Sequence, residues 1–574
     1  MICTPRGFTE AYATTQRRIL LVGLDGASPD LIEQWVNQGK LPNMEKIIKR
    51  GVFGRLKSTV PASSATAWTS AVTGVNPGKH GIFEFVYYNG YERRPVNSTQ
   101  RSAKAIWHLL NARNKTVGIL NVPITFPAEK VKGFMVSGLM AGLDTEFTYP
   151  KGLRSDLVAS GYRIDIAYER WASMILGIET NLYSVVEDVC EMIEKRKEAT
   201  LRLMQQFQPD FFMVVFTALD RIQHQFWKFM NSPDLGNVDE VEGLATVVQS
   251  TYEKMDDALG EILAHVDNNT DVIVFSDHGF GPEYKSVRLN VWFKQMGLLR
   301  LRRSPTGFLR ALGITEANLV TQARRILGAG TLRRLTSGRQ SSLRRLRYRY
   351  KIPRLRFPTL EEFDWKSTKA CYLFQHMIKI NLAGREPEGI VNPGIEYERL
   401  RTEIVNGLLE LRDPENGTKM VKAVHRREEL YHGECLSHAP DLLVEMAEGY
   451  ADDEYVAGEL VVPSTERYGP GLQGPSGCHR SEGVFMATGP DISTGGVIEG
   501  SEILDITPTV LYLMGVPVPK YMDGKVLIRA TRPGFFQGHP ISYEEREGEE
   551  ESKQIYSQEE MREIEDRLRA LGYL

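Results

Sequence analysis

Acidic and histidine side chains follow three short apolar segments of this chain, close to the point where each segment ends. These side chains are Asp25, Asp220 with the nearby His224, and Asp277 with His278. A single carboxylate in such a place means little, because aspartate often caps a following helix. Three such places, two of them with a histidine at hand, indicate ligands for a metal ion.

The spacing of these residues also fits metal coordination. Asp220 and His224 are four residues apart, so both can face one ion if a helix begins there. Asp277 and His278 are adjacent, and the freedom of Gly279 allows a bent loop that points both to one side. Carboxylates mixed with neutral imidazoles suit Zn²⁺, with Mn²⁺ as the alternative. Because one catalytic zinc takes about three protein ligands, we expect two divalent ions roughly 4 Å apart, an arrangement that promotes phosphoryl transfer.

A candidate nucleophile lies in a stretch rich in hydroxyl groups, from Val60 to Ser70. The stretch predicts a loop followed by a helix that ends at Gly74. A hydroxyl at the start of that helix would face backbone N–H groups, which bind phosphate well. Ser63 and Ser64 are both candidates for a nucleophile activated by a metal ion. The alternative is that the serine only caps the helix.

The apolar segments predict buried strands of a parallel sheet. They are Ile19 to Leu24, Phe211 to Leu219 and Val272 to Phe275, with further strand candidates at Gly51 to Thr59 and Val117 to Val122. Helical patterns such as Leu182 to Phe207 alternate with them. This order predicts an α/β fold with a mostly parallel sheet and helices on both faces. Since ligands bind beyond the carboxyl ends of such strands, the acidic side chains should meet at one edge.

Length and composition set the class of protein. The chain has 574 residues, 42% of them hydrophobic and 25% charged, which suits a large core with insertions. A formal net charge of -3 gives no general attraction to nucleic acid or membranes. The five cysteines show no paired spacing, and no apolar run reaches the ~18 residues of a membrane helix. We therefore expect a cytoplasmic protein without a transmembrane segment.

Residues 300–356 differ from the rest, because they hold sixteen Lys or Arg and a single acid, Glu316. We interpret this segment as part of an inserted cap, either as a solvated helical face or as a cationic lid for an anionic partner. The expected divisions are a core at 17–282 and 471–530, a cap at 283–470, and a tail at 531–574. The tail is acidic and then forms an amphipathic helix, with Met561 and Ile564 on its apolar face.

Five blocks of sequence occur in a characteristic order between Leu24 and Arg480. They are Leu24-Asp25-Gly26, the Ser64 segment that runs on to Thr73-Gly74-Val75-Asn76-Pro77-Gly78-Lys79-His80-Gly81, Asp220-x-x-x-His224, Ser276-Asp277-His278-Gly279, and Gly477-Cys478-His479-Arg480. Together they resemble the alkaline phosphatase superfamily, with the closest likeness to its type I phosphodiesterase/nucleotide pyrophosphatase branch and related predicted phosphohydrolases and phosphomutases.

The resemblance implies an alkaline-phosphatase-like fold and a complete set of site residues. One ion would be surrounded by Asp25, Ser64, Asp277 and His278, and the other would be held by Asp220, His224 and His479. The resemblance also favours Ser64 over Ser63 as the nucleophile. His479 enters the set through the resemblance alone.

The expected activity is hydrolysis of phosphate esters, mono- or diesters, through a phosphoserine at Ser64. The substrate would be a small molecule. Ala67 stands where the nucleotide pyrophosphatase pattern has Asn, and Asn121 could supply a substrate-binding amide instead. Two alternatives stay open: a phosphomutase with the same metal site, and a non-catalytic protein that binds nucleic acid or another anion through the Arg-rich segment.

Overall fold

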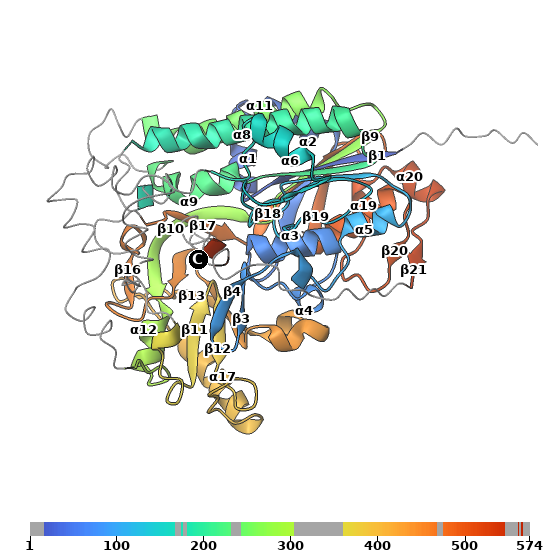
Figure 1. Cartoon of the computed structure of the whole chain (residues 1–574). Helices are drawn as coiled ribbons and strands as arrows, with labels where there is room; N and C mark the ends of the chain where they lie inside the picture. The colour runs from blue at the N-terminus through green and yellow to red at the C-terminus, as the bar shows by residue number, and fades with distance from the viewer. Residues whose placement is uncertain are drawn as a thin grey trace, which may run out of the picture.

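Within the described residues, nine strands form one sheet in the order β19-β2-β18-β9-β1-β8-β5-β6-β7 (Figure 1). The computed structural model describes residues 17–166, 171, 174–175, 181–230, 243–302, 360–467, 474–545, 561 and 564–565. The strands of this sheet are β1 (Arg18–Leu24), β2 (Val52–Lys57), β5 (Val117–Leu120), β6 (Gly133–Val136), β7 (Thr148–Tyr149), β8 (Phe211–Phe216), β9 (Thr270–Phe275), β18 (Glu482–Thr488) and β19 (Gly496–Glu502).

The centre of the sheet is parallel. β1 lies between β8 and β9 and is parallel to both, and β5 continues the parallel order beyond β8. All six residues of β8 are apolar and buried, as expected for a strand covered on both faces. β18 is antiparallel to both β9 and β2, so the sheet is mixed at this side. The carboxyl ends of β1, β8 and β9 therefore lie next to one another.

Helices cover both faces of the sheet (Figure 1). On one face lie α1 (Pro29–Asn37), α2 (Pro42–Arg50), α8 (Leu182–Phe207), α9 (Ala218–Met230) and α11 (Val247–Leu263). On the other face lie α3 (Ser64–Thr73), α5 (Ile106–Asn111), α19 (Ile506–Leu513) and α20 (Pro533–Gly538). Alternate residues of β1 belong to the two hydrophobic clusters, Leu20 and Val22 to one and Ile19 and Leu21 to the other. The predicted α/β architecture is confirmed.

Smaller sheets lie to one side of the main sheet (Figure 1). One has the order β11-β12-β14-β13, and another joins β10 to β15, β16 and β17. Their strands are β10 (Gly279–Arg288), β11 (Ala370–Phe374), β12 (Met377–Ile380), β13 (Val421–Arg426), β14 (Leu442–Met446), β15 (Gly449–Asp453), β16 (Val461–Pro463) and β17 (Gly477–Arg480). The further elements are β3 (Val86–Asn89), β4 (Glu92–Pro95), α4 (Pro77–His80), α6 (Leu153–Ala159), α12 (Leu289–Gln295), α17 (Ile395–Leu409), α18 (Arg427–Leu430), β20 (Val518–Pro519) and β21 (Tyr543–Glu544).

Strand β10 crosses the proposed boundary between core and cap. Its residues 279–282 pair with β17, whereas residues 283–288 pair with β15 and residues 285–287 with β16. The change of partner falls at the residue where we place the boundary. The division into core and cap remains a proposal.

One predicted strand was too long. The segment Phe211 to Leu219 forms a strand only as far as Phe216, because the chain turns and α9 begins at Ala218. Asp220 therefore lies in the first turn of a helix and not at a strand end. The predicted helix from Leu182 to Phe207 is confirmed at both ends.

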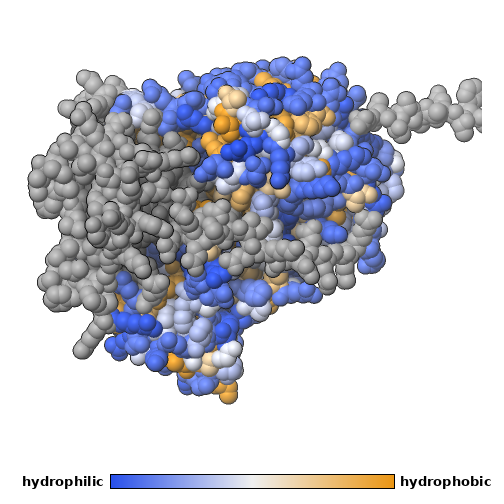
Figure 2. Space-filling view, viewed as in Figure 1, coloured by the Kyte–Doolittle hydropathy of each residue, from blue (hydrophilic) through white to orange (hydrophobic). Residues whose placement is uncertain are grey.

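Most of the Arg-rich segment, from residue 303 to 356, lies outside the described residues, so its interpretation as a lid stays a prediction. Most of the predicted C-terminal helix lies outside them as well. Met561 and Ile564 are described, and both are buried in the larger hydrophobic cluster, as expected for a helix that packs on its own protein. Across the described segments we find no helix of sufficient length and apolar character to span a membrane. Figure 2 shows mainly hydrophilic residues on the described part of the visible face, with apolar residues in small groups.

Candidate active site

The seven predicted ligands converge beyond the carboxyl ends of β1, β8 and β9. They are Asp25, Ser64, Asp220, His224, Asp277, His278 and His479. In one group, His479 Nε2 lies 3.2 Å from Asp220 Oδ1 and 3.1 Å from His224 Nε2. His224 Nε2 lies 3.4 Å from the same carboxylate oxygen. These three side chains can contact a single ion.

The second group surrounds His278. Its Nε2 lies 3.5 Å from Asp25 Oδ1 and 3.3 Å from Asp277 Oδ2. Ser64 Oγ lies 3.1 Å from His278 Nε2 and 3.3 Å from Asp25 Oδ1. Asp220 is within reach of this group too, since its carboxylate and ligand atoms of Asp25 and His278 lie within 4.8 Å of one another. Asp220 therefore joins the two groups.

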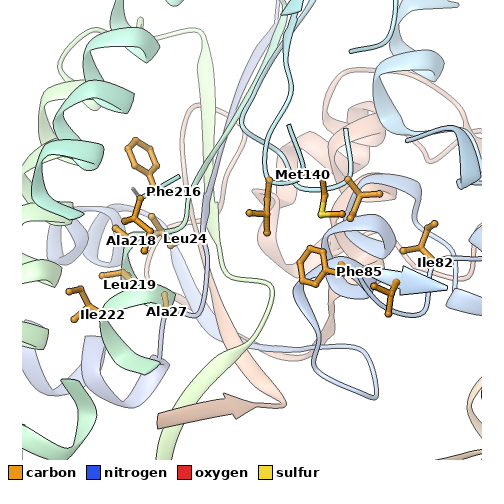
Figure 3. Close-up of a cluster of buried hydrophobic side chains, with 14 of the residues drawn as sticks. Leu24, Ala27, Ile82, Phe85, Met140, Phe216, Ala218, Leu219 and Ile222 are labelled. Carbon is orange, nitrogen blue, oxygen red and sulfur yellow. The ribbon is translucent and has the colours of Figure 1, made fainter. Parts of the chain in front are cut away.

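The backbone around the site ties the strand ends together. Gly26 has a φ of 70°, and its N–H donates to Asp277 Oδ1 at 3.2 Å. The N–H of Asp220 donates to the carbonyl of Asp25 at 3.1 Å. Figure 3 shows buried apolar side chains from the segments that carry Asp25 and Asp220, including Leu24 at the end of β1, Ala27 just after it, and Leu219 and Ile222 from α9. Apolar packing thus fixes the segments that carry the carboxylates.

All three histidines present the same nitrogen to the site. The Nδ1 atoms of His224, His278 and His479 lie 3.0, 3.0 and 2.8 Å from the carbonyl oxygens of Gly477, Gly279 and Ala62. A carbonyl oxygen only accepts, so each Nδ1 carries the hydrogen and each Nε2 offers a lone pair. His224 Nε2 and His479 Nε2 then face each other as two acceptors, an arrangement that fits a cation between them.

The carboxylates give the same indication. Burial raises the pKa of Asp277 to about 8, and the negative charge of Asp220 adds to the effect. Burial, followed by the charges of Asp277 and Asp220, raises the pKa of Asp25 well above its usual value. Asp277 Oδ2 is buried and has no hydrogen-bond partner within the described part of the chain. Divalent cations would compensate these buried negative charges, so the residues present fit the predicted metal ions.

Other features of the site favour the protonation states in which the proposed ligands bind a metal ion. Burial alone would raise the pKa of Asp220, but its neighbours, among them the Arg221 guanidinium 2.7 Å away, hold this pKa well below its usual value. Arg221 also forms an ion pair of 2.6 Å with Asp165. Burial, with His479 next, lowers the pKa of His278 well below 6.5, so its imidazole is neutral at pH 7.

The helix that carries Ser64 begins at Ser64 itself. α3 ends at Gly74, which has a φ of 68° and donates its N–H to Ser70 O, as the sequence predicted. Ser63 occupies the N-cap position, but its side chain makes no capping hydrogen bond. The amino end of α3 therefore carries Ser64 with backbone N–H groups that can bind an anion.

The sequence model of the type I phosphodiesterase / nucleotide pyrophosphatase family matches residues 19–459. The chain belongs to this family. The match covers all the proposed ligands except His479.

Solved structures of two proteins are similar to this chain. Phosphonoacetate hydrolase from Sinorhizobium meliloti 1021, in complex with phosphonoformate, is 14% identical with a TM-score of 0.50, and the alignment covers 87% of this chain and 95% of that one. An inactive variant of murine ectonucleotide pyrophosphatase/phosphodiesterase 5, in complex with AMP, is 12% identical with a TM-score of 0.47, over 90% and 100% of the two chains. No curated protein sequence gives a significant match. The first likeness shows an alkaline-phosphatase-like fold.

Sequence reasoning did not find the role of Trp68. Its Nε1 donates to Asp25 Oδ2 at 3.2 Å, so it orients a proposed ligand. The available signal was its position four residues after Ser64, which places both side chains on one face of α3.

Replacement of Trp68 by phenylalanine keeps the aromatic packing and removes this hydrogen bond. We expect Trp68→Phe to lower the affinity for Zn²⁺ or Mn²⁺ by about tenfold or more, measured by competition with a chelator of known affinity. Trp107→Phe is a matched control, because Trp107 is buried in the same cluster and donates to Glu129 Oε2 at 3.3 Å, away from the site. Equal affinities in the wild type and Trp68→Phe would contradict this role.

Asn121, which we predicted as a substrate-binding amide, is not among the residues that line the cavity beside the proposed ligands. It is fully buried at the end of β5. In the amide orientation that satisfies all its neighbours, its oxygen accepts from Arg196 at 2.8 Å and its nitrogen donates to Ile164 O at 3.0 Å. These contacts indicate a structural role, and the position gives no support to a contact with the substrate.

Proposed function

We propose that this chain is a phosphoric ester hydrolase that uses two divalent cations and Ser64 as its nucleophile. Membership of the phosphodiesterase family supports hydrolysis of phosphoesters. The observation that carries the proposal is the position of Ser64 Oγ, 3.1 Å from His278 Nε2 and 3.3 Å from Asp25 Oδ1, at the amino end of α3.

The metal ions would be held by the residues of the two groups. Asp25, Asp277 and His278 with Ser64 would hold one ion, and His224 and His479 the other, with Asp220 between them. Bound Zn²⁺ or Mn²⁺ would stabilise negative charge on the attacking and leaving oxygens. The fixed Nδ1–H tautomers keep the histidine lone pairs aimed at the ions.

Ser64 would carry out a double displacement. Its Oγ forms a bond to phosphorus, the bond from phosphorus to the leaving oxygen breaks, and the hydroxyl proton passes to water, because Asp25 and His278 would be occupied as ligands of the ion. The free N–H groups at the start of α3 bind the non-bridging phosphoryl oxygens. Water then attacks the phosphoserine from the side that the leaving group has vacated, which releases phosphate or a phosphomonoester and restores the serine.

A cavity of about 660 Å³ beside the site gives room for a small-molecule substrate. His224 and His479 line it from the metal site, and Trp227 and Phe280 add aromatic surface. The four described cysteines are free thiols, which supports the proposed cytoplasmic location.

The test is a panel of model phosphomonoesters, phosphodiesters and phosphonates, each assayed with added Zn²⁺ or Mn²⁺ and with a chelator. We expect turnover of at least one phosphate ester that depends on the metal ion. Hydrolysis in ¹⁸O-labelled water should place the label in the phosphate product. Transfer of the phosphoryl group to another oxygen of the same molecule would instead identify a phosphomutase, and no metal-dependent turnover in the panel would count against the proposal.

A further inference from the structure

The loop that precedes Ser64 is held by three contacts from distant parts of the chain. Val60 O accepts a hydrogen bond from the hydroxyl of Tyr431. Ala62 O accepts from His479 Nδ1 at 2.8 Å, and Ser63 Oγ donates to Glu84 Oε1 at 2.9 Å. The same loop therefore fixes a proposed metal ligand and the nucleophile that follows it.

Glu84 also holds a part of the cap. It is fully buried, and Gln375, with its amide nitrogen facing the carboxylate, donates to Oε2 at 2.6 Å and to Oε1 at 3.2 Å. Gln375 and His376 form the tip of the β11–β12 hairpin, and their φ angles are 31° and 69°. Positive φ is uncommon for residues other than glycine, so the tip needs support from its surroundings. The N–H of His376 donates to Asp452 Oδ2 at 2.8 Å. The neighbouring residue, Gln375, is held by Glu84.

The hairpin tip faces the substrate cavity. Phe374, Gln375 and His376 line the same cavity as His224 and His479. A molecule bound there is within reach of the tip that Glu84 holds, and Glu84 in turn holds Ser63, the residue next to the nucleophile. Two regions more than 280 residues apart in sequence thus meet at one buried carboxylate.

We propose that Glu84 is a positioning residue, which links the cap hairpin at Gln375 to the nucleophile loop through Ser63. The link sets the position of Ser64 Oγ relative to the substrate in the cavity. The part of this inference that concerns turnover rests on the proposed function.

The kinetic test compares Ser63→Ala, Gln375→Ala and the double variant in the full chain. Because a small misplacement of a reacting group costs up to about 100-fold in rate, we expect each single variant to lower kcat by roughly 10- to 100-fold. KM of Ser63→Ala should stay within about threefold of the wild type, since Ser63 contacts Glu84 and not the cavity. The double variant should be little worse than the poorer single variant, because both changes break one connected path.

Thr116→Ala is the matched control. It removes a hydroxyl-to-aspartate hydrogen bond, from Thr116 Oγ1 to Asp210 Oδ2 at 2.9 Å. This bond lies at the amino ends of β5 and β8, whereas the site lies beyond the carboxyl ends. This variant should keep the wild-type kcat. A wild-type kcat in Ser63→Ala, or kcat losses that simply multiply in the double variant, would overturn the proposal.

A second readout does not need turnover. Hydrogen exchange of the backbone amides of residues 59–66 should become about tenfold faster in Gln375→Ala and stay unchanged in Thr116→Ala. Unchanged exchange in Gln375→Ala would overturn the link between cap and loop. If the wild type lacked phosphoesterase activity while Gln375→Ala still accelerated exchange in this loop, the proposed function would fail and the link would stand.

Discussion

Ser64→Ala is expected to lower kcat by about 10⁴-fold or more, the scale on which enzymes lose rate when a nucleophile is removed. No neighbouring hydroxyl can replace it, because the Ser63 side chain is directed to Glu84. The fold should remain intact, since alanine suits a helix start with no hydroxyl cap. Metal content should stay near that of the wild type, because Asp25, Asp277 and His278 remain.

Ser70→Ala is the control for this variant. Ser70 lies in the same helix, is fully buried, and bonds through Oγ to His80 Nε2 at 2.9 Å, away from the metal site. We expect it to keep kcat within about threefold of the wild type. Mass spectrometry of wild-type protein quenched during turnover should locate a phosphoryl group on Ser64. A kcat for Ser64→Ala within tenfold of the wild type would refute the assignment of the nucleophile.

Removal of divalent ions with a chelator is expected to abolish turnover and to lower the thermal stability. A ligand that binds only the folded state stabilises it by about 4 kcal/mol when its free concentration is a thousand times its Kd. Two such sites would therefore shift Tm by many degrees. Readdition of Zn²⁺ or Mn²⁺ should restore both turnover and Tm, whereas Mg²⁺ alone should do so poorly, because histidine nitrogens suit the former ions better.

The loss of stability should also depend on pH. In the metal-free protein the pKa of Asp277 is about 8 and that of Asp25 is raised as well, whereas an unfolded aspartate has a pKa of about 3.9. Between these values the folded state binds more protons than the unfolded state, so stability falls as pH rises from about 4 to about 8. Bound metal ions keep the carboxylates ionised and should remove this part of the slope.

The measurement is Tm at pH 5 and at pH 8, with chelator and with metal. Burial raises the pKa of Asp271, which lies on β9 outside the proposed metal site, to about 7. Asp271 therefore also makes stability fall as pH rises, in the metal-free and in the metal-bound protein alike. Asp271→Asn removes that common part and serves as the control. Identical pH slopes with and without metal would contradict the account of Asp25 and Asp277.

The parallel core could be predicted from sequence because its strands are buried on both faces and therefore read as continuous apolar runs. The apolar run at β8 continued into the buried first turn of α9, so periodicity alone did not show where the strand ends. Asp220 and His224 were still predicted to share one face, since that inference needed only a helix at this point.

Contacts between distant segments were beyond such reasoning. His479 reaches the site because β17 pairs with β10, with His479 opposite Phe280, and only the resemblance to known phosphatases pointed to it. Glu84 and Gln375 carry no sequence signal for each other, because their contact joins segments far apart in the chain. The position of Trp68 placed it on one face of α3 with Ser64, but its partner Asp25 lies on another element. The position of Asn121 suggested an amide that binds the substrate, but its side-chain oxygen accepts hydrogen bonds from the buried Arg196.

The most direct test of the account is elemental analysis of the purified chain after dialysis against a trace of Zn²⁺ or Mn²⁺. We expect about two divalent ions per chain in the wild type. We expect about one in His479→Ala, because this variant loses a ligand from only one of the two groups. Less than one ion per wild-type chain, with no increase after exposure to either metal, would contradict a two-metal site beside Ser64.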